Sequence, residues 1–414
     1  MNYLDPEFST LPDGWTSKKL HDVVEIHNTK RQPLNARERE GHKGIYPYCG
    51  ANGVVDYIDD YRFDGEYVLI AEDGGYWGKH QPSSYIMCGK FWVNNHAHVV
   101  CAKDGETTNV FFSNIVNYLN IDPFIGGDAR GKLTKAILTQ LAIPLPQLTE
   151  QKKIAHILST VQRAIEAQER IIQTTTELKK ALMHKLFTEG LRNEPQKQTE
   201  IGLIPKSWDV AVLGSLAKVG NGSTPKRANE AYWEGGTIPW LNSTKIHDRF
   251  ITEAEQFVTS QAVKECHLPK VAQNSLLIAI TGQGKTLGNS AITRIETCIN
   301  QHLAYAQFHS PKIVPDFVLW FMQTRYNYLR SIALGGGSTK GALTCGFLKT
   351  LPIPVPSTDE QKEIVALFQI LEDKQGAAAS KQSTLQDLFL TLLHELMTAK
   401  TRVDHLTIKL GSIS

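Results

Sequence analysis

The sequence predicts an α+β protein in which two mixed α/β globular domains alternate with two long helices that pair antiparallel as a coiled coil. Three observations predict this fold class. A stretch of about 55 residues occurs twice without a gap, and such a repeat has to be explained before any fold is assigned. Both copies carry a heptad pattern of apolar residues. The segments that precede the two copies show a weaker likeness to one another.

The repeat is clearest at two proline-rich turns. Residues 141–146 read Leu-Ala-Ile-Pro-Leu-Pro, and residues 351–356 read Leu-Pro-Ile-Pro-Val-Pro. Each turn is followed by the same tripeptide, at 150–152 and 360–362, which reads Glu-Gln-Lys. The copies are 210 residues apart (354 − 144 and 360 − 150). The chain is therefore expected to contain one structural unit twice, with the two units related by an approximate two-fold axis.

After each tripeptide an apolar seam advances by alternating steps of four and three residues, the period of a left-handed coiled coil. The first seam consists of Ile154, Leu158, Val161, Ile165, Gln168, Ile172, Thr175, Lys179, Leu182 and Leu186. The second consists of Ile364, Phe368, Leu371, Gln375, Ala378, Gln382, Leu385, Phe389, Leu392 and Leu396. Each run would form a helix of about 60 Å, too long for one globular core, so the two helices are expected to pair. Ser357 followed by Glu360 predicts a capping box at the start of the second helix.

The globular segments also correspond. Trp208 repeats Trp15 at an offset of 193 (208 − 15), so the second copy holds 17 additional residues (210 − 193). Residues 67–71 and 275–279 predict equivalent strands, whereas 114–119 and 316–328 predict short helices. The predicted parts are a loose leader (1–10), a first domain (11–146), a first long helix (147–190), a linker (191–203), a second domain (204–356), a second long helix (357–400) and a tail (401–414).

The amino-acid composition limits the class of protein and its compartment. The 414 residues include 41% hydrophobic ones, as in a folded protein, and the formal charge of +2 does not by itself predict a polyanionic partner. The six cysteines are scattered without metal-ligand spacing, which favours reduced thiols in a cytoplasm. No apolar run approaches the roughly 20 residues of a membrane span. Residues 1–10 do not resemble a signal peptide.

Antiparallel helices in the order domain, helix, domain, helix would hold one globular domain at each end. A pseudo-two-fold protein with two separated domains suits a two-part site on double-stranded DNA, with the helix pair as a ruler. Because the domains have diverged, they are expected to read two different half-sequences rather than a palindrome.

At this point the chain resembles a known family, the specificity subunits of Type I restriction-modification systems. The resemblance rests on the proline-rich turns with their Glu-Gln-Lys tripeptides and on Gly222-Ser223-Thr224-Pro225, Tyr232-Trp233 and Ile238-Pro239-Trp240. It implies two target recognition domains and helices that dock two modification subunits. Those subunits would carry S-adenosylmethionine and methylate adenine, and restriction subunits would cleave unmodified DNA with ATP and magnesium. The chain itself is expected to bind no cofactor and to catalyse no reaction alone.

Candidate DNA-binding residues lie in loops of both domains, where short polar side chains, cations and aromatic rings can contact phosphates and base edges. The first domain lacks a Gly-x-Thr-Pro sequence after Trp15, so its candidates are less directly matched. They are Thr29, Lys30, Arg31, Glu72, Asp73, Tyr76, Trp77, Lys79, Arg130 and Lys132. In the second domain they are Thr224, Lys226, Arg227, Thr281, Gln283, Lys285 and Lys340. Ordinary solvated loops, or core packing for Trp77, would explain the same residues.

Two other function classes stay open from the sequence. Residues 279–286 read Ala-Ile-Thr-Gly-Gln-Gly-Lys-Thr and match a phosphate-binding loop of nucleotide hydrolases. Such a loop must open a helix, but residues 291–293 predict a strand, and the first domain has no equivalent motif. A coiled-coil adaptor without DNA binding is the second alternative. His96 and His302 recur at equivalent positions, and we interpret them as structural because no nucleophile or carboxylate set repeats with them.

Overall fold

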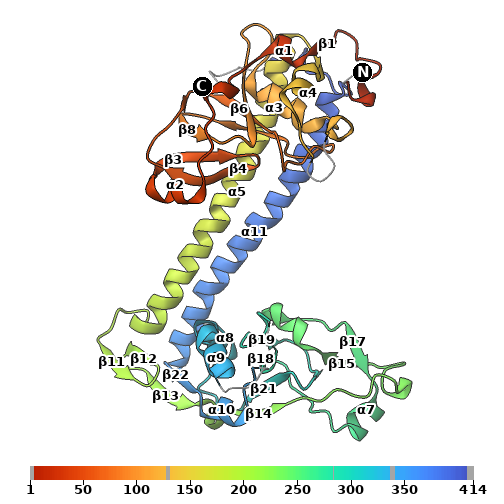
Figure 1. Ribbon diagram of the computed structural model, residues 1–414. Coiled ribbons are helices and arrows are strands. Elements are labelled where there is room, and N and C mark those ends of the chain that lie inside the picture. Colours follow the sequence, from red (N-terminus) through yellow and green to blue (C-terminus); the bar gives the residue numbers. More distant parts are fainter. Residues whose placement is uncertain (1–3, 127–130, 283, 336–340, 408–414) are drawn as a thin grey trace. The chain divides into compact units, whose positions relative to one another are not determined.

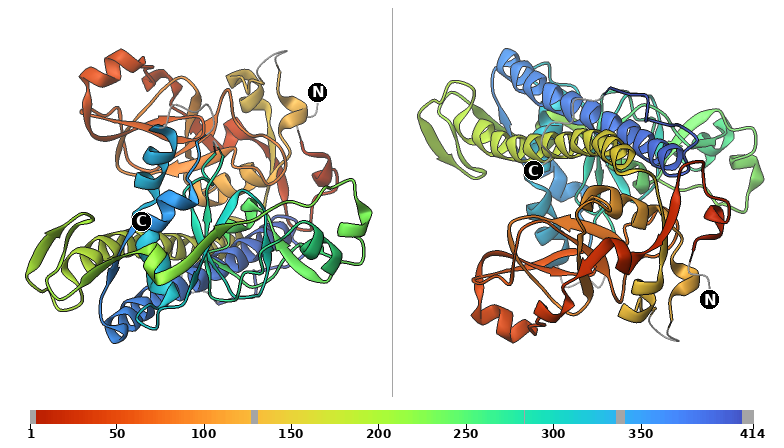
Figure 2. Two further views of the ribbon diagram at one scale, coloured as in Figure 1. Left: turned by 90° about the horizontal axis from the view of Figure 1, so that it is seen from below. Right: turned by 90° about the horizontal axis from the view of Figure 1, so that it is seen from above.

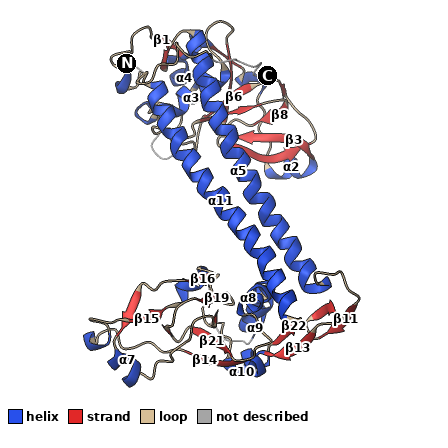
Figure 3. Ribbon diagram, turned by 180° about the vertical axis from the view of Figure 1, so that it is seen from behind, coloured by secondary structure: helices blue, strands red, loops and turns tan. Residues whose placement is uncertain are grey.

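The computed structural model describes residues 4–126, 131–282, 284–335 and 341–407. The chain divides into two compact units, which we call the first unit (Met1–Arg170 with Ala378–Ser414) and the second unit (Ile171–Ala377). Each unit combines a globular domain with parts of the helices α5 (Leu148–Glu189) and α11 (Thr358–Met397). Helices and strands are thus mixed in both units, which confirms the predicted α+β class (Figure 3).

Two four-stranded sheets form the first domain, in the orders β2-β9-β6-β7 and β4-β3-β8-β5, and a separate strand pair joins β1 to β10. Its strands are β1 (Thr16–Lys19), β2 (Val24–Ile26), β3 (Lys43–Gly50), β4 (Gly53–Ile58), β5 (Phe63–Asp64), β6 (Tyr67–Ala71), β7 (Ser84–Met87), β8 (Lys90–Val93), β9 (Ala97–Ala102) and β10 (Ala142–Leu145). Its helices are η1 (Pro6–Phe8), α1 (Leu20–Val23), η2 (Asn28–Lys30), α2 (Ala36–Gly41), α3 (Asn109–Tyr118), η3 (Asp122–Phe124) and α4 (Lys135–Gln140).

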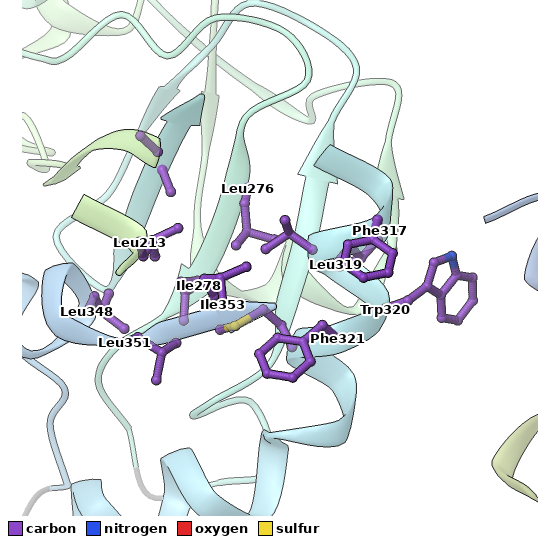
Figure 4. Close-up of a cluster of buried hydrophobic side chains, with 14 of the residues drawn as sticks. Leu213, Leu276, Ile278, Phe317, Leu319, Trp320, Phe321, Leu348, Leu351 and Ile353 are labelled. Carbon is purple, nitrogen blue, oxygen red and sulfur yellow. The ribbon is translucent and has the colours of Figure 1, made fainter. Parts of the chain in front are cut away.

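The second domain repeats this plan with the orders β14-β21-β18-β19-β16 and β17-β15-β20 and the pair β13-β22. Its strands are β13 (Asp209–Val212), β14 (Ala217–Asn221), β15 (Ile238–Leu241), β16 (Phe250–Ile251), β17 (Gln256–Val258), β18 (Leu276–Ala279), β19 (Ser290–Thr293), β20 (Cys298–Ile299), β21 (Leu303–Phe308) and β22 (Pro352–Val355). Its helices are α6 (Leu213–Leu216), η4 (Glu230–Tyr232), η5 (Ser243–His247), α7 (Ser260–Glu265), α8 (Pro315–Thr324), α9 (Tyr326–Gly335) and α10 (Cys345–Thr350). Figure 4 shows buried side chains of α8, such as Phe317 and Phe321, in the cluster that also holds Leu276 and Ile278 of β18.

The correspondence is strand by strand. In both domains a central antiparallel strand, β6 or β18, lies between two neighbours of equivalent register. In the other sheet of each domain one strand pair is parallel, β3 with β8 and β15 with β20. The duplication inferred from the helices therefore extends through the diverged globular domains.

α5 and α11 run antiparallel in each unit (Figures 1 and 2). In the first unit the start of α5, with Ile154 and Leu158, shares a hydrophobic cluster with Leu393 and Leu396 near the end of α11. In the second unit the end of α5 packs on the start of α11, where the rings of Phe187 and Phe368 stack at 6.3 Å. The antiparallel pairing predicted from the two seams is confirmed.

The predicted seam positions are protected from solvent along both helices. All ten predicted positions of α5 are buried or half-buried, and so are all ten of α11. Ile370 on α11, which lies off the seam, is 62% exposed. None of the helices within the described ranges is long and apolar enough to cross a membrane.

Three chain segments differ from their predictions. Residues 4–10 of the leader are not loose, because Phe8 is buried in the first core and Asp5 accepts a hydrogen bond from the amide of Asn120 (2.7 Å). The segment expected as a linker (191–203) forms most of a hairpin of β11 (Gln196–Thr199) and β12 (Gly202–Pro205). The capping box is only half formed. Ser357 accepts from the amide of Glu360 (3.3 Å), but the Glu360 carboxylate accepts from the indole N–H of Trp208 (3.1 Å) instead of the helix cap.

Candidate nucleic-acid interface

The loop after the central strand has the same backbone frame in both domains. The amide of Glu72 donates to the carbonyl of His96 (2.8 Å), and the amide of Ile280 donates to the carbonyl of His302 (2.9 Å). The carbonyls of Glu72 and Ile280 accept from the amides of Leu133 and Leu343, both at 2.8 Å. Glu72 and Ile280 are therefore equivalent positions, although one is a carboxylate and the other is apolar.

In the first domain this position centres an ion-pair network. Arg31 donates to Glu72 (2.6 Å) and to the carbonyl of Ala97 (2.8 Å), and the Lys132 ammonium lies 3.2 Å from the other Glu72 oxygen. The structure thus brings together three predicted candidates from loops 41 and 60 residues apart (72 − 31 and 132 − 72). Burial acts to raise the pKa of Glu72, but Arg31 and the other cationic neighbours outweigh it and lower this pKa below its usual value.

His98 is the buried member of the same network. Its Nε2 lies 2.7 Å from the carbonyl of Leu133 and must donate, so its Nδ1 accepts from the side-chain amide of Asn28 (2.8 Å). The imidazole is fully buried, and this burial lowers the pKa of His98. The ring is therefore held neutral, and Arg31 and Lys132 supply the positive charge opposite Glu72.

In the second domain a chain of polar contacts links two predicted loops. Thr224 donates to the side-chain oxygen of Gln301, the Gln301 amide nitrogen lies 3.2 Å from His302, and His302 lies 2.5 Å from the Thr281 hydroxyl. Glycine is required at position 222, because a Cβ on Gly222 would lie 1.9 Å from the carbonyl oxygen of Ile299. The Gly-Ser-Thr-Pro sequence thus presses its loop against the strand end that carries His302.

The loop that contains Lys285 is anchored from α9. The Tyr326 hydroxyl donates to the carbonyl of Lys285 (2.7 Å), and Arg330 donates to the carbonyl of Gly284 (2.6 Å). The Lys285 side chain is exposed. The following residues enter the strand β19 and not a helix, so the phosphate-binding loop of a nucleotide hydrolase is not formed, as the sequence predicted.

Arg227 packs against two aromatic rings. Its guanidinium lies 3.8 Å from the ring centre of Trp233 and 5.0 Å from that of Trp240, and it donates to Gln256 (2.6 Å). The first domain has a counterpart in Arg39, which lies over Tyr48 (5.3 Å) and donates to Asp56 (3.0 Å). The strand register makes the sites equivalent, because Tyr48 pairs with Asp56 and Trp240 pairs with Gln256. Arg39 is ion-paired with a carboxylate, whereas Arg227 is hydrogen-bonded to the neutral side chain of Gln256.

Other candidates divide by exposure. Thr29, Lys30, Tyr76 and Lys226 are exposed, while Asp73 contacts His96 and Lys79 pairs with Glu7 (2.7 Å). Trp77 is 6% exposed and donates to the carbonyl of Ala71 (3.3 Å), so it belongs to the core and we withdraw it as a DNA contact. Arg130, Gln283 and Lys340 lie outside the described residues.

Several residues that hold or adjoin these loops were not predicted from the sequence. Arg39, Arg330 and Tyr326 belong to this group, as does Asn52, whose side chain donates to the carbonyl of Gly74 (2.9 Å). Only the spacing of four residues between Tyr326 and Arg330, which puts both on one face of α9, could have indicated a shared role.

Comparison with known proteins identifies the family. The model of the Type I restriction modification DNA specificity domain matches residues 12–176 and 205–385. The MjaIX specificity subunit of a type I restriction enzyme from Methanocaldococcus jannaschii is 32% identical over 45% of this chain and 43% of its own. The MjaVIII specificity subunit from the same organism is 21% identical over 98% of this chain and 97% of its own. The crystal structure of a Type I restriction-modification S subunit from M. genitalium has the same fold, with a TM-score of 0.64, 16% identity and coverage of 95% and 98%.

These matches cover both domains and most of both helices. The chain therefore belongs to the Type I restriction-modification DNA specificity family, and its two domains are the two copies of the family's specificity domain.

Proposed function

We propose that this chain selects the DNA sequence on which a Type I restriction-modification complex acts. One observation carries the proposal. The loop after the central strand keeps its backbone frame in both domains while its side chains change, from Glu72 and Asp73 to Ile280 and Thr281. Two readers of different base sequences require a constant backbone frame with variable side chains, because base edges are distinguished by their pattern of donors, acceptors and methyl groups.

Each domain reads one half of a bipartite site in double-stranded DNA, and the helix pair spaces the two domains. The exposed cations Lys30, Lys226, Arg227 and Lys285 contact phosphates or guanine, and Thr224 and Thr281 contact phosphates or bases. Lys132 and Arg31 act in the first domain mainly by holding Glu72 in place. The expected contacts of Arg130, Gln283 and Lys340 stay predictions.

The chain performs no chemistry alone. Two modification subunits dock on the paired helices and bring S-adenosylmethionine, and restriction subunits bring ATP and magnesium. The seam side chains Ile154, Leu158, Val161, Ile165, Ile172, Leu182, Ile364, Phe368, Leu371, Leu385, Phe389 and Leu392 hold the helices together. Exposed faces of the same helices are left for the partner subunits. The complex would work in the cytoplasm.

The test is transfer of labelled methyl groups from S-adenosylmethionine to DNA by the modification subunits, with and without this chain. We expect methylation at one two-part motif only when the chain is present. Methylation of the same motif in its absence would contradict the proposal. ATP binding by the isolated chain that Lys285→Ala abolishes would favour the nucleotide-hydrolase alternative.

A further inference from the structure

The Glu-Gln-Lys tripeptide that begins each long helix has a contact pattern that DNA reading does not explain. Gln151 and Gln361 are 1% and 0% exposed, although glutamine is a residue of the surface in most proteins. Both lie in the first turn of a long helix and point into the globular domain of their own unit. A buried amide must satisfy its two donors and its acceptor, so their partners reveal what each glutamine holds.

In the first unit Gln151 joins three parts of the chain. Its Nε2 donates to the carbonyls of Pro146 (3.0 Å) and Glu106 (3.0 Å). Its Oε1 accepts from the hydroxyl of Thr107 (2.8 Å), which is itself 5% exposed. Glu106 and Thr107 belong to the loop between β9 and α3, so one side chain ties the long helix to the body of the domain.

In the second unit Gln361 makes the equivalent contacts. Its Nε2 donates to the carbonyls of Pro356 (3.0 Å) and Lys312 (2.7 Å), and its Oε1 accepts from the amide of Val314 (2.8 Å). Lys312 and Val314 lie in the loop between β21 and α8, the counterpart of the loop between β9 and α3. The joint is kept although the domains that it holds have diverged.

The neighbouring glutamates fix a second segment to the same helix end. Glu150 is held by two hydrogen bonds from Arg402 (2.8 and 3.1 Å), in the segment that follows α11. Glu360 accepts from the amide of Leu191 (3.2 Å), in the segment that follows α5. Each tripeptide thus holds a domain through its glutamine and the chain end of the other helix through its glutamate.

We propose that Gln151 and Gln361 are positioning residues that fix the angle between each reading domain and its helix, and so determine how strictly the complex reads the spacing between the two half-sites. This inference rests on the proposed function. A domain that tilts on its helix could reach a half-site displaced by one base pair, whereas a clamped domain could not. The glutamines contact no base, so their loss should leave the preferred half-sequences unchanged.

The experiment uses the complete chain assembled with its modification subunits. The parent complex, Gln151→Leu and Gln361→Leu are compared on duplexes that carry both half-sites at the native spacing and at one base pair more or less. Leucine has a similar volume and no hydrogen-bonding group. We expect the ratio of methylation at the native spacing to that at the altered spacings to fall on the order of 3- to 10-fold, which corresponds to the loss of one or two buried hydrogen bonds.

The controls separate positioning from stability. Lys152→Ala and Lys362→Ala change the exposed neighbours in the same turns and should keep the parent ratio. A loss of stability alone would lower methylation at all spacings together, and an unchanged ratio in both leucine variants would overturn the proposal. If those variants do not assemble, Thr107→Val removes a single hydrogen bond, and an unchanged ratio there overturns it. Absence of any two-part motif with the parent complex would count against the proposed function instead.

Discussion

Glu72 and His98 make the first domain sensitive to acid. The equivalent positions of the second domain hold Ile280 and Ala304, since Ile70 pairs with His98 as Ile278 pairs with Ala304. Both groups titrate at lower pH in the folded protein than in the unfolded chain. Below about pH 6.5, the ordinary pKa of histidine, His98 binds a proton more readily in the unfolded chain than in the folded domain. The free energy of unfolding of the first domain therefore falls as the pH is lowered. Below about pH 4.5 protonation of Glu72 adds to the effect, because the stability from its ion pairs is lost as the pH falls through its lowered pKa.

We therefore predict that hydrogen exchange at β6 accelerates relative to β18 when the pH falls from 7.5 to 5.5, after correction for intrinsic exchange rates. His98→Gln should remove most of this difference, because glutamine does not titrate. Equal changes in both strands of the parent chain, or an undiminished difference in His98→Gln, would show that the buried network is not the cause.

A second prediction at this scale concerns Lys285. Lys285→Ala should weaken binding of the assembled complex to its cognate duplex by about 1–3 kcal/mol if the ammonium meets a guanine. If it meets a phosphate, the slope of log K against log salt should fall by about one. Fluorescence anisotropy at several salt concentrations distinguishes the two. Lys264→Ala, an exposed lysine on α7, is the matched control, and equal behaviour of both variants would remove Lys285 from the interface.

Residue contacts were the least predictable feature of the chain. Tyr76 and Trp77 read alike in the sequence, but Tyr76 is 58% exposed and Trp77 is buried. Only the tertiary fold, which brings Ala71 and Gly131 against the indole, decides between them. The pairing of Arg31 with Glu72 was also missed. Each residue separately suits a DNA contact, and only the tertiary fold brings the two together.

At the scale of elements the sequence was more informative. The heptad seams located both helices and the faces by which they pair, because a period of 3.5 residues has one structural solution over such a length. The strands at 67–71 and 275–279 were also located, since both are apolar runs buried in a sheet. The hairpin at 196–205 was missed because β11 is polar, and its tight turn depends on Gly202 with φ of 98°.

Phe368 provides the test of the seam. Its ring is fully buried and lies 4.8 Å from Trp320 and 6.3 Å from Phe187, so it joins both long helices to α8. Phe368→Ala should lower the free energy of unfolding of the second unit by about 3–5 kcal/mol, measured by urea denaturation. Ile370→Ala, two residues further on, should change it by no more than about 0.5 kcal/mol. Similar losses in both variants would contradict the assignment of the seam.

For the whole molecule the duplication is the organising fact. Residues 150–152 and 360–362 begin equivalent helices, and each receives the segment that follows the other helix, Arg402 on Glu150 and Leu191 on Glu360. The segment after α11 thus contacts the start of α5, and the segment after α5 contacts the start of α11 in the same way. The sequence predicted the two repeated units, but this closure could not be predicted from a polar tail without periodicity.

The central claim is that each domain reads one half of the DNA site independently. The most direct measurement replaces residues 11–132 with the matching segment of another member of the family and maps methylated adenines across the genome in cells that also express the modification subunit. We predict a two-part motif in which one half changes and the other half and the spacing stay as in the parent. A motif that changes in both halves, or in neither, would contradict the account.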